Sequence, residues 1–114
     1  MLKPTVKLYY ANWCGHCRNF ADKWSALKNF FDQNDVAHEE FEDGSNKEEI
    51  KNAKISAYPT LRIERGNEIE EYRGPMDVQS IIQRVLPNYQ LGGAAASYKK
   101  YRKYKAKYLK LKGI

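Results

Sequence analysis

Cysteine is scarce in this sequence, with only two residues among 114. Small secreted proteins built on disulfide scaffolds contain many more cysteines, so that class is excluded. Long apolar runs are also missing: no stretch of about 18 consecutive apolar residues occurs, and we therefore expect no transmembrane segment. The first residues run directly into a strand-like pattern without the apolar stretch of a signal peptide. These absences predict a cytoplasmic protein that is not secreted through a signal peptide.

Acidic residues are absent after Asp77, whereas eight of the 20 basic residues lie within the last sixteen positions. Residues 1–93 consequently have a net charge of −2, and the remaining residues one of +8. The overall charge of +6 describes neither part. The length suffices for one domain and is too short for two. We expect a near-neutral domain at 1–90, a Gly/Ala linker at 91–97 and a basic Tyr/Lys-rich tail at 98–114.

The hydrophobic pattern of the domain alternates between the period of a strand and that of a helix. The expected strands cover residues 3–10, 36–41, 60–63 and 69–72, and the expected helices cover about 14–33, 46–53 and 78–86. A Ser45–Glu48 capping box and Asp77 are the expected starts of the second and third helices. The order β-α-β-α-β-β-α predicts an α/β fold with a four-stranded mixed sheet and helices on both faces.

The two cysteines, Cys14 and Cys17, lie where the first strand ends and the first helix begins. At this position the free N–H groups and the positive end of the helix dipole stabilise a thiolate. Cys14 is expected to be the exposed nucleophile, and Cys17, one turn deeper, the shielded thiol that resolves a mixed disulfide. A protonated His16 would add positive charge and make the disulfide a better oxidant.

A second interpretation of the cysteine pair is half of a zinc site. Zinc needs four ligands, and beyond the pair the sequence offers only His16 and His38, without a second CxxC motif. A c-type haem site requires histidine directly after the second cysteine, where Arg18 stands instead. Spacing and ligand number thus favour a redox-active pair that uses no metal and no cofactor.

Two motifs carry a resemblance to a known family: Tyr9-Tyr10-Ala11-Asn12-Trp13-Cys14-Gly15-His16-Cys17 and Ala57-Tyr58-Pro59-Thr60. The first resembles the active site of thioredoxins, and its Gly-His dipeptide resembles that of protein disulfide isomerase domains. The second is similar to the cis-proline loop of the same superfamily. The resemblance covers about residues 3–86 and implies the minimal form of the thioredoxin fold, without the first strand and helix of a full thioredoxin.

The resemblance also assigns roles to residues outside the cysteine pair. It implies that Pro59 is the cis-proline beside the cysteines, that the backbone of Tyr58 pairs with a bound peptide, and that Gly74 lines the same groove. Trp13 and Tyr58 are expected to form an apolar rim for an extended or unfolded peptide. These four residues are the predicted substrate-binding residues.

The sequence departs from the family pattern at Leu8, six residues before Cys14. The family usually has a buried acid there that assists proton transfer at the buried cysteine, so the departure implies a slower resolving step. If the strand at 36–42 alternates, Ala37, Glu39 and Phe41 share a face, and Glu39 is a candidate proton relay. The alternative is that Glu39 is simply solvated, because acidic side chains are rarely buried without a partner.

The basic tail repeats tyrosine every three or four residues, at Tyr98, Tyr101, Tyr104 and Tyr108. The spacing predicts a helix with a tyrosine seam, and the charge allows instead a disordered, solvated end. Nucleic acid, an anionic membrane surface and an acidic protein are the candidate partners. The tail also resembles the Tyr/Lys-rich C-termini of proteins from giant DNA viruses of the mimivirus group. That resemblance implies location in the host cytoplasm or the virion.

Together, the motifs predict an enzyme, a thiol–disulfide oxidoreductase that acts on protein thiols and disulfides. The Gly-His dipeptide favours the oxidase or isomerase end of the family's range, with a thiol oxidase or reductase as redox partner. The alternative is a thioredoxin-like binding or virion-associated module whose basic tail anchors it to an acidic partner.

Overall fold

The computed structural model describes residues 3–89 of the chain. The predicted linker and basic tail lie outside these residues, so what the sequence predicts for them stays a prediction. The elements are β1 (Thr5–Tyr10), α1 (Gly15–Gln33), β2 (Ala37–Glu42), α2 (Lys47–Ala53), β3 (Thr60–Arg65), β4 (Glu68–Glu71) and α3 (Val78–Val85). This order confirms the arrangement predicted from the hydrophobic pattern.

The four strands form one mixed sheet in the order β2-β1-β3-β4. The first two strands, β1 and β2, are parallel because α1 connects them, and the other two neighbouring pairs are antiparallel. A tight turn joins β3 to β4, and Gly66 adopts a φ of 60° within it, a backbone conformation that glycine reaches without steric cost. In the parallel pair Leu8 lies opposite Glu40, and β2 forms one edge of the sheet.

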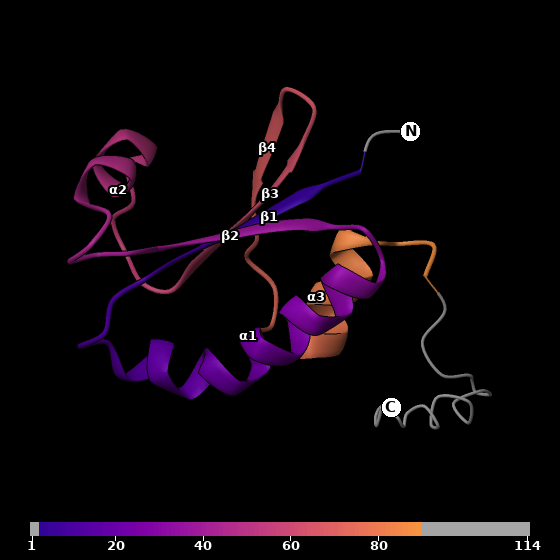
Figure 1. Cartoon of the computed structure of the whole chain (residues 1–114), viewed down its shortest axis with the longest axis horizontal. Helices are drawn as coiled ribbons and strands as arrows, with labels where there is room; N and C mark the ends of the chain where they lie inside the picture. The colour runs from indigo at the N-terminus through magenta and orange to yellow at the C-terminus, as the bar shows by residue number, and fades with distance from the viewer. Residues whose placement is uncertain (1–2, 90–114) are drawn as a thin grey trace.

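The sheet separates two layers of helix (Figure 1). Helices α1 and α3 lie together on one face, and α2 lies on the other side, where it packs against β2. No helix within residues 3–89 is both long and apolar enough to cross a membrane. The predicted mixed sheet with helices on both faces is thus confirmed.

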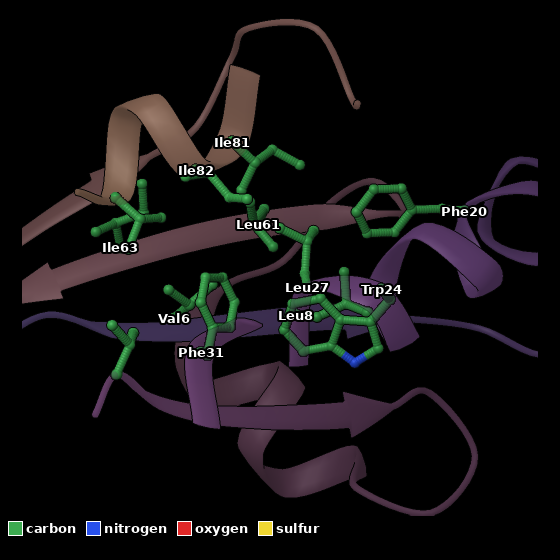
Figure 2. Close-up of a cluster of buried hydrophobic side chains, with 12 residues drawn as sticks. Val6, Leu8, Phe20, Trp24, Leu27, Phe31, Leu61, Ile63, Ile81 and Ile82 are labelled. Carbon is green, nitrogen blue, oxygen red and sulfur yellow. The ribbon is translucent and has the colours of Figure 1, made fainter. Parts of the chain in front are cut away.

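The core lies between the sheet and the α1–α3 layer (Figure 2). Helix α1 contributes a single buried stripe spaced three or four residues apart, as an amphipathic helix requires. Its members are Cys17, Phe20, Trp24, Leu27 and Phe31. The last four meet inward-facing residues of β1 and β3 and the apolar side of α3, which are Val6, Leu8, Leu61, Ile63, Ile81, Ile82 and Val85. The three aromatic residues of the α1 stripe, Phe20, Trp24 and Phe31, are therefore buried in this core.

Of the two helix starts predicted from the sequence, the start of α3 is confirmed and that of α2 is not. Asp77 caps α3, with its Oδ1 accepting a hydrogen bond from the Ser80 N–H at 2.8 Å. The predicted Ser45 cap of α2 is wrong. Asn46 is the residue directly before this helix, and no side chain forms a capping hydrogen bond there. The Asn46 side chain instead accepts a hydrogen bond from the Glu42 N–H at 3.0 Å, which ties the helix start to the end of β2.

The core makes a direct stability prediction at Leu27, which is fully buried. Leu27→Ala should lower the free energy of unfolding of the reduced protein by about 3 kcal/mol, because it removes buried apolar surface and leaves a cavity. Ile69→Ala is the matched control, since that side chain is 62% exposed and should change the value by less than about 0.5 kcal/mol. Urea denaturation followed by circular dichroism measures both, and equal losses would contradict this placement of the core.

Candidate active site

The site begins at Cys14, which is the N-cap of α1. The first N–H groups of a helix have no partner within the helix, so a cap must satisfy them. Here the Cys14 sulfur accepts a hydrogen bond from the Cys17 N–H at 3.1 Å, and no acidic side chain lies in the first turn. Negative charge on this sulfur would therefore meet a backbone donor and the positive end of the helix dipole.

Both cysteines are free thiols and both are buried, each with 7% of its surface exposed. The prediction of an exposed Cys14 beside a shielded Cys17 is wrong in this respect. The physical reason is a small apolar cluster around the pair, in which Ala11 is fully buried and Tyr10 and Tyr58 cover the thiols. What distinguishes the two sulfurs is their place at the helix start rather than their exposure.

Cys17 is held in its protonated form. Burial, followed by the hydrogen bond with Cys14, raises the pKa of the Cys17 thiol from 9.0 to about 11. The backbone of Ala11 and the charge of Arg18 act in the opposite direction but do not offset this increase. At neutral pH Cys17 is therefore a thiol, which must lose a proton before it can act as a nucleophile.

The Tyr58–Pro59 loop approaches the cysteines from the other side of the site. The Tyr58 carbonyl accepts a hydrogen bond from the Cys14 thiol at 3.7 Å, and the peptide bond between Tyr58 and Pro59 is cis. Pro59 lines the same pocket as Cys17. The structure thus brings together the two motifs that carry the resemblance, although more than 40 residues separate them.

An aromatic rim stands beside the pair. Trp13 is 69% exposed and meets the Tyr58 ring edge-on, with 5.8 Å between the ring centroids. Asp43, in the turn after β2, accepts hydrogen bonds from Trp13 Nε1 at 3.3 Å and from the Tyr58 hydroxyl at 2.9 Å. Burial and Asp43 raise the pKa of Tyr58, so its phenol remains a donor. Sequence reasoning missed Asp43, which local pattern identifies only as part of a turn.

Three further predicted site residues lie outside the contacts described above. His16 is exposed in the first turn of α1. Gly74 lies after β4 against Tyr72, where an added Cβ would come within 2.7 Å of the Tyr72 hydroxyl oxygen. Glu39 is not brought to the cysteines, because it lies opposite Lys7 in the sheet register and pairs with that lysine at 3.8 Å.

Metal ligands are not gathered at the site. Among residues 3–89 no group of three or more His, Cys, Asp or Glu side chains is arranged to hold a metal ion. His38, the remaining histidine considered as a ligand, instead contacts Asp32 at 2.8 Å, away from the cysteine pair. The side chains that surround Cys14 and Cys17 suit thiol chemistry.

Solved structures share the fold of this chain. The first thioredoxin domain of mouse protein disulfide-isomerase A4 superposes with a TM-score of 0.64 at 24% identity, covering 80% of this chain and 69% of that one. A thioredoxin from Fasciola hepatica gives a TM-score of 0.63 at 22% identity, covering 76% of this chain and 82% of that one. At these identities the likeness establishes the fold alone.

Curated relatives are similar in sequence over the same region. A protein disulfide-isomerase of Hordeum vulgare is 30% identical over 97 residues, which cover 80% of this chain and 18% of that protein. Protein disulfide-isomerase A4 of Mus musculus is 30% identical over 86 residues, covering 73% of this chain and 14% of that protein. The chain thus spans less than a fifth of the length of these relatives. Residues 2–86 match the family model described as Thioredoxin, and the chain belongs to the thioredoxin family.

Proposed function

We propose that the chain exchanges disulfides with protein substrates through the Cys14–Cys17 dithiol and works toward the oxidase or isomerase end of its family. The observation that carries this proposal is the position of the Cys14 sulfur. It accepts the Cys17 N–H at the start of α1 and lies beside the Tyr58 carbonyl, within the apolar cluster. Family membership and the protein disulfide-isomerases among the relatives support thiol–disulfide chemistry.

In the reducing direction the Cys14 thiolate attacks one sulfur of a substrate disulfide, and the other substrate sulfur leaves as a thiolate. Cys17 then loses its proton and attacks the Cys14 sulfur of the mixed disulfide. The bond between Cys14 and the substrate breaks, and the second substrate sulfur leaves with the electron pair. The oxidising direction is the reverse: a substrate thiolate attacks Cys14, and Cys17 departs and takes up a proton.

The preferred direction follows from which form of the pair is stabilised. The backbone donor and helix dipole at Cys14 favour the thiolate, and exposed His16 adds a cation when it is protonated. Stabilising the thiolate stabilises the reduced pair, so the disulfide becomes a stronger oxidant. Trp13 and Tyr58 supply an apolar rim for the substrate peptide, Pro59 lines the pocket beside Cys17, and we assign Gly74 to the same peptide groove on the family resemblance. The substrates would be protein thiols and disulfides, and a cytoplasmic thiol oxidase or reductase would recharge the pair.

The first prediction concerns the reduction potential of the Cys14–Cys17 pair. Equilibration with glutathione should give a reduction potential of about −180 mV, because the reduced form of the pair is stabilised. Thioredoxin typically has a value of about −270 mV. A value at the thioredoxin end would contradict the oxidase or isomerase direction. Cys14→Ser is the control and should form no intramolecular disulfide. If the unmodified chain forms no reversible disulfide, the proposed enzymatic activity is overturned, and the alternative of a thioredoxin-like binding module is favoured.

A second prediction concerns the unequal reactivity of the two thiols. When the reduced protein is treated with iodoacetamide at neutral pH, Cys14 should be alkylated at least about tenfold faster than Cys17, because only thiolates react. Cys17 holds its proton up to a pKa of about 11, so its alkylation rate should rise with pH toward that value. Fragmentation mass spectrometry distinguishes the two sites. Equal rates at neutral pH would contradict the assignment of Cys14 as nucleophile.

The third prediction tests the aromatic rim. Asp43→Ala removes the acceptor shared by Trp13 and Tyr58, and losing such a hydrogen bond costs about 1 kcal/mol. The KM for a peptide substrate should therefore rise about fivefold, while the reduction potential stays unchanged. Asp43→Asn keeps one of the two acceptor oxygens, so only one of the two donors loses its acceptor, and the rise in KM should be smaller than in Asp43→Ala. A changed potential with an unchanged KM would show that Asp43 acts on the cysteines and not on the rim.

A further inference from the structure

A pocket of about 220 Å³ lies beside Cys17 and is lined mainly by residues of β1, α1 and β2. Cys17 lines it together with Leu8 and Tyr10 of β1, Lys28 of α1 and Glu40 of β2. Glu40 is the sole carboxylate among its lining residues. The volume is ample for several water molecules, and the polar groups on its walls can bind them.

The sheet register explains why Glu40 reaches this pocket and Glu39 does not. Glu40 lies opposite Leu8 in the parallel β1–β2 pair, and Leu8 belongs to the core beneath α1, where Figure 2 shows it with Trp24. Successive side chains of a strand point to opposite faces. Glu40 therefore projects toward α1, whereas Glu39 projects to the opposite face of the sheet, where it pairs with Lys7.

Two residues of α1 hold the Glu40 carboxylate in place. Its Oε1 accepts hydrogen bonds from Trp24 Nε1 at 2.7 Å and from Lys28 Nζ at 2.9 Å. Burial would raise the pKa of Glu40, but these two donors and the charges of Lys28 and His38 lower it overall. Glu40 is thus a carboxylate at neutral pH. Its side chain remains 40% exposed, so it can exchange a proton with solvent.

The Cys17 thiol is a weak acid without a direct basic partner. Cys14, Arg18 and the Ala11 backbone are the neighbours that act on its titration, together with burial. Tyr10 lines the same pocket as Cys17 and Glu40, and burial, followed by the charge of Glu40, raises the pKa of its phenol. The phenol consequently keeps its proton at neutral pH and can serve as a hydrogen-bonding partner to water between Cys17 and Glu40.

We propose that Glu40 is the proton acceptor for Cys17 in the resolving step, acting through water in this pocket. The inference rests on the proposed disulfide exchange. As the Cys17 sulfur attacks the Cys14 sulfur, the Cys17 proton passes through water to the Glu40 carboxylate. The bond between Cys14 and the substrate breaks, the substrate sulfur leaves with the electron pair, and Glu40 returns the proton to solvent. In the oxidising direction protonated Glu40 delivers a proton to the departing Cys17 thiolate.

The test compares Glu40→Gln with Glu39→Gln, two adjacent substitutions on opposite faces of β2. The reduced protein is mixed with the aromatic disulfide dithiobis(nitrobenzoate) in a stopped-flow instrument. The first nitrothiobenzoate released reports attack by Cys14, and the second reports resolution by Cys17. Glu40→Gln should slow the second phase about tenfold and leave the first unchanged, because general-base assistance is lost from one step only. Glu39→Gln should change neither phase.

A pH profile separates proton transfer from a structural effect of Glu40. The rate of the second phase should fall as the pH drops through the pKa of Glu40, because a protonated carboxyl cannot accept. Lys28→Met removes a cation that lowers this pKa, so the fall should move to higher pH. In Glu40→Gln this fall in the rate of the second phase at low pH should disappear. Thermal unfolding of each variant verifies that the fold is retained.

The outcomes distinguish this inference from the function on which it rests. If the unmodified protein releases no nitrothiobenzoate, or only one equivalent, the proposed disulfide exchange fails. If both phases occur and Glu40→Gln matches Glu39→Gln in rate and pH dependence, the exchange stands and the role of Glu40 is overturned. The role of Glu40 is also overturned if Glu40→Gln slows the second phase but Lys28→Met does not move the fall in rate to higher pH.

Discussion

The hydrogen bond from the Cys17 N–H to the Cys14 sulfur is the contact around which the site is built. A helix start needs an acceptor for its free N–H groups, and here that acceptor is the reactive atom itself. The interaction depends on α1 being fixed where β1 ends. The buried stripe of α1, from Phe20 to Phe31, provides this anchoring by packing against the sheet and α3.

Strand β2 supplies polar groups on two sides of the cysteine pair. Asp43, directly after the strand, holds Trp13 and Tyr58 together at the outer rim. Glu40, within the strand, faces the inner pocket and is held by Trp24 and Lys28. Since β2 is an edge strand, both carboxylates stay near water, and neither pays the full desolvation cost of a buried charge. An edge strand in parallel register with β1 can therefore serve both ends of the site.

The apolar residue at Leu8 illustrates how stability and chemistry are divided in this fold. Leu8 is 4% exposed and completes the core at the centre of β1, where an ionised carboxyl would need a buried partner. The carboxylate that borders the Cys17 pocket comes instead from the adjacent strand, already paired with Lys28. In this arrangement the central strand contributes packing and the edge strand contributes charge, so the two requirements do not compete at one position.

The sequence alone determined the features that depend on neighbours along the chain. Periodicity identified the strands and helices, residue type identified the Asp77 cap, and the spacing of Cys14 and Cys17 indicated a redox pair, because each of these depends on residues within one or two turns. Only the tertiary structure decided that Cys14 is covered, that Asp43 joins Trp13 to Tyr58, and that Glu40, not Glu39, lines the pocket beside Cys17. These outcomes depend on strand register and on contacts between distant segments. A shift of one residue in register exchanges the faces of a strand, and no local pattern in β2 encodes that choice.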